Sequence, residues 1–304
     1  MKTIPELAQA ETAAQSARAV QSPVLACLCL DFERDPLTRQ TVLAASHQEA
    51  PLRVLRAFTL EDGTALVHLH NVSGGLLGGD RLALRVRLDA GSNAQLTTTG
   101  ATRLYRPRQE APVTFQANEI TVGEDALLEY LPDQLIPFAG ARFSQRTSIR
   151  LARGAGLFWW EILAPGREAR GEIFEYASVE LKTDLIALGK PIVAERVRLE
   201  PRHFALSSLS RLGPCRTWAT FYLCRVGLET RAWLALEQEL RQLAQERTVP
   251  GETFWGISTL AAHGLVVRCA AGHGRHVLPG LHALWRAAKL RLYGREAVPP
   301  RKVY

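Results

Sequence analysis

Short runs in which apolar and polar residues alternate make up most of the chain after Pro23. In the clearest run, 81–89 (RLALRVRLD), apolar Leu or Val stands at every second position. A period of two is typical of a β-strand that buries one face and leaves the other in water. Comparable runs, separated by Gly-containing turns, predict further strands at 65–70, 113–122, 147–151, 173–181 and 193–199. Many short strands with few helices between them predict a mainly β protein.

A faint internal repeat predicts how these strands are arranged. The segments 88–96 (LDAGSNAQL), 122–128 (VGEDALL) and 151–157 (LARGAGL) each contain an apolar residue, a turn, and then Ala-x-Leu at the start of a new strand. The alanines stand at positions 94, 126 and 155, which gives intervals of 32 and 29 residues. A recurring strand–turn–strand unit of this period predicts a β-helical or stacked-sheet scaffold.

Helical periodicity is confined to two segments, both in the C-terminal third. Between residues 230 and 247, large apolar residues recur every three or four positions, at Trp233, Leu236, Leu240 and Leu243. Near the C-terminus, before a C-capping glycine at 294, the same spacing links Leu281, Leu284, Trp285, Ala288 and Leu292. We therefore expect about two α-helices beside the strands.

No linker-like stretch divides the chain after residue 22, so we expect residues 23–304 to form a single elongated β-rich domain. Residues 1–22 are polar and rich in Ala, which predicts a partly flexible N-terminal extension. They contain one early Lys and no apolar block, unlike a secretion signal. No apolar run approaches the roughly 18 residues that a membrane span needs. These features predict a cytoplasmic protein that does not contact membranes.

The basic charge of the chain favours an acidic protein partner over nucleic acid. There are 37 Lys and Arg residues against 30 Asp and Glu, a formal net charge of +7 at pH 7. Arg far outnumbers Lys, and the basic residues are spread along the sequence without a block that contains interleaved aromatic residues. Arg is favoured at protein interfaces because its planar guanidinium pairs readily with carboxylates.

The five cysteines are too few and too scattered for a disulfide framework, and no C-x-x-C pair indicates a zinc knuckle. Cys27 and Cys29 would share one face of a strand. Small buried hydrophobic residues are the favoured interpretation of this pair, ahead of a pair of metal ligands.

The Gly-rich segment 73–80 (SGGLLGGD) is not a phosphate-binding loop. A strand follows it where a phosphate loop has a helix, and no Lys lies nearby. We expect Gly74, Gly75, Gly78 and Gly79 to be structural, because glycine permits positive φ and close contact between backbones. The sequence also lacks G-x-S-x-G and H-E-x-x-H motifs.

Two histidine pairs have spacings that a metal ion can use. His68 and His70 would point to one face of a strand, and His273 and His276 lie in a Gly-flanked segment. Such pairs are more often surface residues or hydrogen-bonded core groups. Neither pair supplies enough ligands for a tight, permanent metal centre.

Four glutamates lie in strongly apolar stretches, at Glu129, Glu161, Glu172 and Glu195. A buried carboxylate is costly unless it is paired or hydrogen-bonded. One interpretation pairs them with nearby arginines, for which the candidates are Arg142, Arg167, Arg170 and Arg196. The other is a polar lining that contacts a cation weakly and lets it pass, since tight binding would trap it.

Several motifs in the same order along the chain resemble the signature of one protein family. They are 71–82 (NVSGGLLGGDRL), 96–106 (LTTTGATRLYR), 128–141 (LEYLPDQLIPFAGA) and 160–174 (WEILAPGREARGEIF), followed by Leu-Trp-Arg at 284–286 and Gly-Arg at 294–295. With them the chain resembles the UreD (also called UreH) urease accessory proteins from about residue 24 to its end. It departs from their pattern in the N-terminal extension and around residues 202–262.

The resemblance implies a protein that is not an enzyme but a metallochaperone and complex scaffold. Members of this family join the accessory proteins UreF and UreG, the latter a GTPase, on apo-urease, and two copies are expected to associate through the UreF complex. The assembly delivers nickel(II), which is bound transiently, so no tightly bound cofactor is expected. The family fold is β-helical.

The resemblance also implies a water-filled tunnel as the nickel path. By motif position, the best candidates for its lining are Thr98, Thr99, Glu161 and Glu195. Weaker candidates are Asp80, Glu129, Asp133 and Arg167.

Three other functions remain as alternatives. A structural adaptor without any metal path needs no polar interior. A metal-dependent hydrolase needs three or more ligands that converge on an open metal position. A nucleic-acid-binding module is suggested by the net charge alone.

Overall fold

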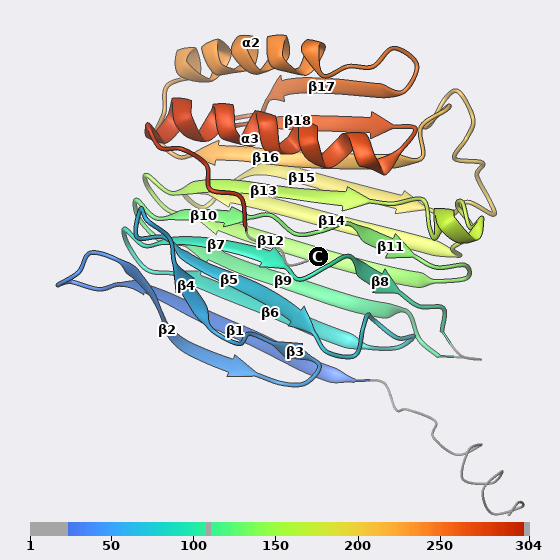
Figure 1. Cartoon of the computed structure of the whole chain (residues 1–304), viewed down its shortest axis with the longest axis horizontal. Helices are drawn as coiled ribbons and strands as arrows, with labels where there is room; N and C mark the ends of the chain where they lie inside the picture. The colour runs from blue at the N-terminus through green and yellow to red at the C-terminus, as the bar shows by residue number, and fades with distance from the viewer. Residues whose placement is uncertain (1–23, 108–110, 301–304) are drawn as a thin grey trace, which may run out of the picture.

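The computed structural model describes residues 24–107 and 111–300, most of them in strands (Figure 1). The first nine strands are β1 (Leu25–Arg34), β2 (Thr41–Gln48), β3 (Leu52–Arg53), β4 (Ala57–Thr59), β5 (Ala65–Asn71), β6 (Arg81–Leu88), β7 (Asn93–Thr98), β8 (Thr102–Leu104) and β9 (Thr114–Val122). They are followed by β10 (Leu127–Tyr130), β11 (Leu135–Pro137), β12 (Arg142–Leu151), β13 (Gly156–Leu163), β14 (Ser178–Ala187), β15 (Lys190–Leu199), β16 (Thr217–Arg225), β17 (Thr253–Thr259) and β18 (Gly264–Ala271).

The helices lie in the C-terminal third, as the periodicity predicts. They are α2 (Thr230–Glu246) and α3 (Val277–Tyr293), with short 3-10 turns η1 (Glu168–Arg170) and η2 (Gly274–His276). The mainly β fold class with two α-helices is therefore confirmed. The extension at residues 1–22 lies outside the described residues. No helix in residues 24–107 and 111–300 is long and apolar enough to cross a membrane.

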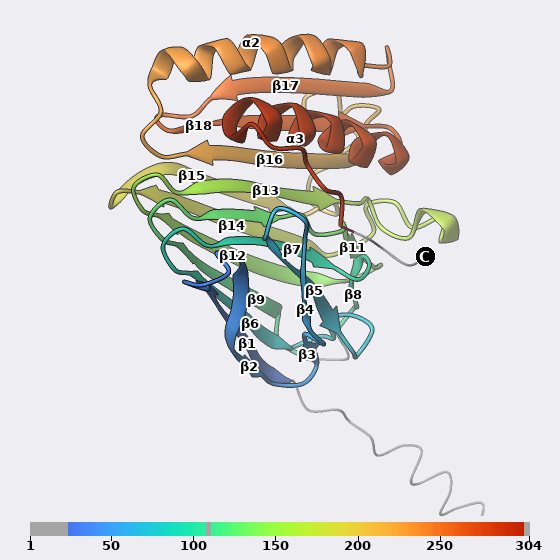
Figure 2. The ribbon, with the colours of Figure 1, turned by 60° about the vertical axis from the view of Figure 1, so that its left-hand side comes forward.

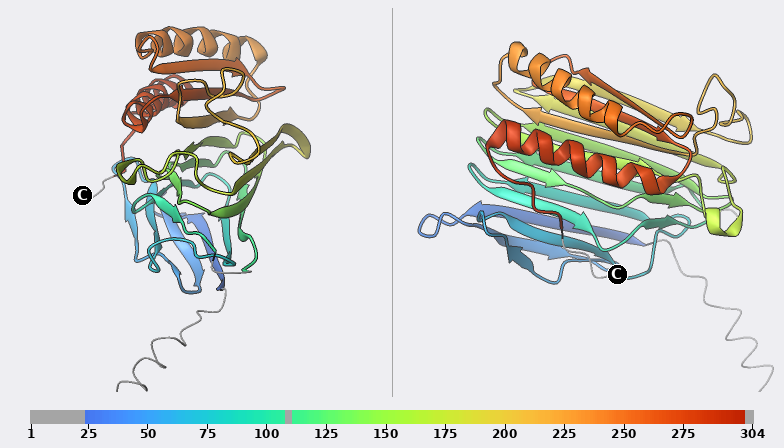
Figure 3. Two further views of the ribbon diagram at one scale, coloured as in Figure 1. Left: turned by 90° about the vertical axis from the view of Figure 1, so that its right-hand side faces the viewer. Right: turned by 45° about the horizontal axis from the view of Figure 1, so that its top comes forward.

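The strands form two sheets that face each other, as the view along the strands shows (Figure 3, left). The first sheet has the order β15-β14-β12-β9-β6-β1-β2, and the second has the order β17-β18-β16-β13-β10-β7-β5-β3. The chain crosses repeatedly from one sheet to the other, from β6 to β7, from β9 to β10 and from β12 to β13. Successive strands within each sheet are parallel in this region. This coil-by-coil winding is the arrangement that the repeat predicts.

The register explains the uneven spacing of the repeat. Leu88 pairs with Val122, and Val122 pairs with Leu151, so the apolar residue that opens each repeat is stacked in one row. Ala94 follows Leu88 by six residues, whereas the corresponding alanines follow Val122 and Leu151 by four. The first turn is two residues longer, and Ala94 accordingly pairs with Leu128. The repeat therefore marks three stacked coils, with one insertion.

One predicted strand is misplaced. The alternation predicts a strand at 173–181, but β14 covers Ser178–Ala187. Phe174 has a φ of 58°, in the left-handed region, and its N–H donates to the carbonyl of Pro165 at 2.8 Å. A residue in this conformation cannot continue a strand. The apolar residues before Ser178 therefore belong to a turn.

Apolar side chains between the sheets form two clusters, which a polar layer separates. Along β12, Phe143 belongs to one cluster, while Ile149 and Leu151 belong to the other. The inward positions between them are Gln145 and Thr147, both buried. Because inward positions of β12 are polar, its first half does not show the alternation of apolar and polar residues. The hydrophobic pattern therefore predicts a strand only at 147–151. Close packing on both sides fixes the layer in place.

A third apolar cluster lies on the other face of the second sheet, where α2 and α3 cover β16, β17 and β18 (Figures 1 and 2). Trp160, Phe221 and Trp285 are almost fully buried there. Burying an aromatic side chain of this size contributes about 1.5–3 kcal/mol relative to its exposure to water. The helices thus close the outer face of the second sheet, and the polar layer lies on its inner face.

Candidate functional site

Four neighbouring strands of the first sheet place a polar side chain at the same level on the inner face. The register aligns Asn118, Thr147, Thr183 and Glu195. The Asn118 amide donates to the Thr147 hydroxyl at 3.1 Å, and the Gln116 amide donates to Asn118 Oδ1 at 3.0 Å. Buried amides and hydroxyls are stable only when hydrogen-bonded. Gln116, Asn118 and Thr147 therefore form a connected polar network, and Thr183 and Glu195 extend the polar row.

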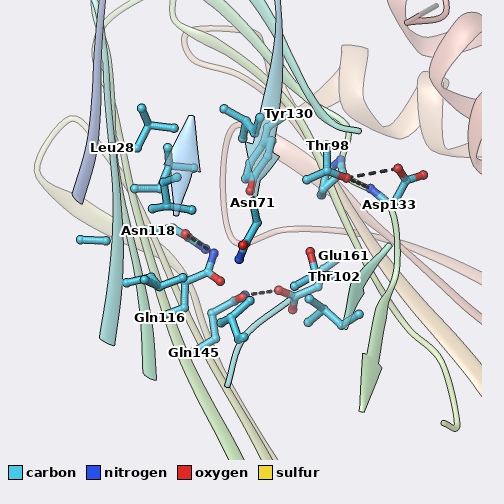
Figure 4. Close-up of a pocket in the computed structure, with 18 of the residues that line it drawn as sticks. Leu28, Asn71, Thr98, Thr102, Gln116, Asn118, Tyr130, Asp133, Gln145 and Glu161 are labelled. Atoms are coloured by element: carbon cyan, nitrogen blue, oxygen red, sulfur yellow. Dashed lines mark hydrogen bonds between the residues drawn. The ribbon is translucent and has the colours of Figure 1, made fainter. Parts of the chain in front are cut away.

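Glu161 of β13 reaches the same level from the second sheet, and its carboxylate accepts a hydrogen bond from the Gln145 amide (Figure 4). Burial raises the pKa of Glu161 to about 7. The Gln145 hydrogen bond opposes that rise, and the nearby charge of Glu195 adds to it. A carboxyl group with this pKa exchanges a proton near neutral pH, and a cation can take the place of that proton.

A cavity of about 90 Å³ lies between the two sheets at this level. Its polar walls include Asn71, Thr98, Asn118, Asp133, Gln145 and Glu161, as the close-up shows (Figure 4). A single water molecule needs about 10–15 Å³ of such volume and two or more polar partners. The cavity is therefore large and polar enough to hold several water molecules.

Thr98 and Asp133 form one wall of the cavity together. The Asp133 N–H donates to the Thr98 hydroxyl at 2.8 Å, and that hydroxyl lies 3.2 Å from Asp133 Oδ2, to which it donates. These contacts join the end of β7 to the segment after β10. They hold the Asp133 carboxylate at the cavity, which gives the site a second acidic group.

Glu195 lies at the far end of the polar row, where a surface groove begins. One of its carboxylate oxygens accepts a hydrogen bond from the Tyr222 hydroxyl, and the other lies 3.1 Å from an Arg268 guanidinium nitrogen. Burial and then the hydrogen bond to Glu195 raise the pKa of Tyr222 far above its usual value. The groove, about 480 Å³ in volume, is lined by Glu195, Arg268 and Thr220, which is the register partner of Glu161.

His70 lines the cavity and also borders a second surface groove. This groove has a volume of about 880 Å³ and is lined by His68, His70 and Thr99 together with apolar residues such as Phe58. Burial, and to a lesser extent the charge of His68, lower the pKa of His70, so its imidazole is neutral near pH 7 and can bind a metal ion.

Asp80 and Arg167, two of the weaker candidates, lie outside the cavity lining. The carboxylate of Asp80 accepts the backbone N–H groups of Val24 at 3.0 Å and Leu77 at 2.9 Å, which fixes the Gly-rich loop. Arg167 pairs with Glu172 and stacks on the Phe138 ring, 4.2 Å from its centre. Their contacts explain both residues as structural.

Glu129 also lies outside the cavity, because alternate residues of β10 point to opposite faces of the sheet. Its carboxylate lies 2.7 Å from Lys289 Nζ and accepts a hydrogen bond from Trp285 Nε1, also at 2.7 Å. Burial raises the pKa of Glu129, and the Lys289 charge opposes the rise. The prediction that Glu129 pairs with an arginine is wrong, because its partner is Lys289. Lys289 lies 160 residues further along the chain, and no local pattern indicates the pair.

The Gly-rich loop packs against the segment that follows β8. Gly74 and Gly79 have φ values of 79° and 90°, and a Cβ atom on Gly78 would lie 2.2 Å from the Cα of Pro107.

Replacement of Gly78 by alanine is therefore expected to lower the free energy of unfolding by about 1–3 kcal/mol, because the backbone must move. Chemical denaturation measures this loss. Gly100→Ala is the matched control, since its Cβ would meet nothing within 4 Å. Equal effects at both positions would contradict the close packing of the loop.

Among residues 24–107 and 111–300, no group of three or more His, Cys, Asp or Glu side chains is arranged to hold a metal ion. The cavity thus offers scattered oxygen and nitrogen donors, not a closed coordination shell. Sequence reasoning missed Asn71, Gln116, Asn118 and Gln145 of the cavity, and also Tyr222 and Arg268, the partners of Glu195. In the sequence, these residues could have been recognised as polar side chains at strand positions that face inward.

Comparisons with known proteins agree with the motifs. The family described as UreD urease accessory protein matches residues 25–304. A urease accessory protein UreD of Herpetosiphon aurantiacus is 47% identical over 277 residues, which cover 91% of this chain and 96% of the relative. UreD of Pseudomonas fluorescens is 34% identical over 83% of this chain and 85% of its own length. For UreD of Thermosynechococcus vestitus the identity is 36%, over 75% of this chain and 80% of the relative. The chain therefore belongs to the UreD family of urease accessory proteins.

Proposed function

We propose that this chain acts in urease maturation as a non-catalytic scaffold through which nickel(II) passes. In this proposal it binds the accessory proteins UreF and UreG and docks on apo-urease in the cytoplasm. Membership of the UreD family supports the role in urease maturation. Nickel is the transient cargo of the chain, and it enters and leaves by way of the polar layer between the sheets.

The observation that carries the proposal is the cavity at Glu161, which lies between two surface grooves. His70 lines both the first groove and the cavity. At the other side, Glu161 lies next to Thr220 in register, and Thr220 lines the second groove with Glu195. Donor groups thus connect each of the two grooves with the cavity.

The chemistry of these donors suits a cation in transit. Nickel(II) binds imidazole nitrogen and carboxylate oxygen, and its affinity depends on how many such ligands converge. At each level only one or two groups meet, first His70, then Asp133 and Glu161, then Glu195. Transport requires binding that is weak enough for the ion to leave each position. Residual water in the cavity would complete the coordination shell.

A structural adaptor without a metal path is the second candidate, and one observation favours it. Both carboxylate oxygens of Glu195 already have partners, Tyr222 and Arg268. A nickel ion would have to displace Arg268 to bind there. The adaptor function needs only the outer surfaces, so it predicts that substitutions inside the cavity are harmless.

Co-purification with the other components tests the proposed function directly. The tagged chain is expressed with and without UreF, UreG and apo-urease, and nickel-dependent urease activity is measured. We expect a stable complex, and at least tenfold more urease activity with the chain than without it. A well-folded chain that binds none of these proteins and leaves activity unchanged would refute both the scaffold and the metal path.

A further inference from the structure

Two cysteine thiols lie side by side on the outer face of the first sheet. Cys27 and Cys29 of β1 are both half-buried, and their sulfur atoms are 3.2 Å apart. Leu28, between them in sequence, points the other way and lines the interior cavity. The cysteine pair is therefore separated from the proposed nickel path by the thickness of the sheet. Neither cysteine is in a disulfide.

The neighbouring strands surround this pair with polar groups. Cys29 is in register with His47 of β2 on one side and with Arg85 of β6 on the other. Glu49 accepts the Cys27 backbone N–H at 2.7 Å, and its second carboxylate oxygen lies 3.2 Å from His47 Nε2. An imidazole oriented by a carboxylate beside thiols is a common arrangement around metal sites. Burial raises the pKa of Cys27, and the charge of Arg85, which is paired with Glu119, opposes that rise.

We propose that Cys27 and Cys29 form a surface site that binds one thiophilic divalent cation, of the class of nickel(II) and zinc(II), through both sulfur atoms. The distance between the sulfurs fits this. Two metal–sulfur bonds of about 2.3 Å separate the sulfurs by about 3.3 Å when they meet at about 90°, as in a square-planar nickel(II) site, and by about 3.8 Å at the tetrahedral angle of zinc(II). The two thiols occupy part of the coordination shell, and water or a donor from a partner protein completes it.

A disulfide fits the geometry less well. Residues i and i+2 on one face of a strand have Cβ atoms roughly 6.5 Å apart, since the rise is about 3.3 Å per residue. A disulfide needs a Cβ–Cβ distance of about 3.5–4.5 Å, so the strand would have to bend. A bridging metal ion tolerates the longer separation.

Chemistry by a free thiolate is also disfavoured. Burial raises the pKa of Cys27 to about 11, and the hydrogen bond and charge of Cys29 act in the same direction. The thiol is therefore protonated at neutral pH and is a poor nucleophile. A metal ion, in contrast, binds by displacing the proton.

Titration of the full-length chain with nickel(II) tests the site, with sulfur-to-nickel charge-transfer absorption as the readout. Oxygen and nitrogen donors give no such band, so the interior path does not contribute to it. We expect one equivalent of nickel(II) to produce the band, and we expect Cys27→Ser and Cys29→Ser each to remove it. Zinc(II) added afterwards is expected to compete with nickel(II) and bleach the band.

The matched control is Cys215→Ser, which alters a thiol elsewhere in the fold and is expected to retain the band. Circular dichroism of each variant, including the one in which both Cys27 and Cys29 are replaced, checks that it is folded. Absence of the band in the wild-type chain, or its persistence when Cys27 and Cys29 are both replaced, would overturn the proposal. Neither result depends on urease activation, so the site and the interior path succeed or fail separately.

Discussion

Replacement of Glu161 by glutamine is expected to lower urease activation about tenfold when nickel is limiting. The substitution keeps the size of the side chain and an oxygen acceptor for Gln145, but it removes the charge that faces the cavity. Loss of one charged ligand on a path of few ligands costs about 1.4 kcal/mol or more, which corresponds to a factor of ten in rate. Activation is measured as urease activity at several nickel concentrations.

The matched control is Glu119→Gln, which removes a carboxylate from the exposed outer face of the first sheet. Glu119 pairs with Arg85 there, and the side chains are 57% and 59% exposed. An exposed pair of this kind contributes about 0–1 kcal/mol, so the variant should fold and activate urease normally. If Glu161→Gln also activates urease normally at limiting nickel, while the complex still assembles, the chain is an adaptor without a metal path.

The pH dependence of stability gives an independent readout on Glu161. Its pKa in the folded chain is about 7, above the usual 4.5 of a glutamate, so the folded state binds the proton more tightly than the unfolded state. Stability from this group is therefore fully present below pH 4.5 and is lost as the pH rises through 7. Glu161→Gln should flatten the decline between these values. An unchanged profile would mean that Glu161 is not desolvated.

Replacement of Lys289 by alanine is expected to have the largest effect on stability, about 3–5 kcal/mol. Lys289 and Glu129 are both fully buried, and their charged atoms are 2.7 Å apart. Without the lysine, the glutamate loses its counter-charge between α3 and the second sheet. The free energy of unfolding from chemical denaturation measures the loss. The loss should increase with pH, because protonation of Glu129 relieves the buried charge at low pH.

A double substitution separates the buried charge from simple loss of packing. Glu129→Gln combined with Lys289→Met removes both charges, keeps the volumes and leaves an acceptor for Trp285 Nε1. Replacement of a buried ion pair by uncharged groups of similar volume is often close to neutral. We expect the double variant to recover most of the stability lost in Lys289→Ala. A double variant as unstable as the single one would show that packing, and not charge, fixes α3.

The parts of this structure that the sequence predicts are those with a regular hydrophobic period. The alternation at 81–89 marks β6 nearly to the residue, and the spacing of apolar residues locates α2 and α3. The apolar residues that open the three repeat units, Leu88, Val122 and Leu151, are stacked on neighbouring strands of the first sheet. These features are local or strictly periodic, so a single sequence contains them.

The candidate site is less visible because its residues break the pattern that identifies strands. Gln145 and Thr147 occupy inward positions that the alternation assigns to apolar residues, and the polar layer is made of such exceptions. The motifs point to Thr98 and Glu161, but partners such as Tyr222 come from strands far away in the sequence. Nor does any local rule separate Glu129, which faces the helices, from Glu161, which faces the cavity.

The winding of the chain between the two sheets also governs the order in which the protein can fold during synthesis. β1 pairs in parallel with β6, so Leu25 meets Arg81 only after more than one full coil has left the ribosome. Until then β1 has β2 as its neighbour in the first sheet, and its other edge is open. By contrast, β14 pairs with β15, and β17 pairs with β18. The strands of each pair are neighbours in sequence, so they can pair as soon as both have been synthesised. The N-terminal half of the nascent chain therefore exposes unpaired strand edges for longest, and it is the half most in need of protection from aggregation.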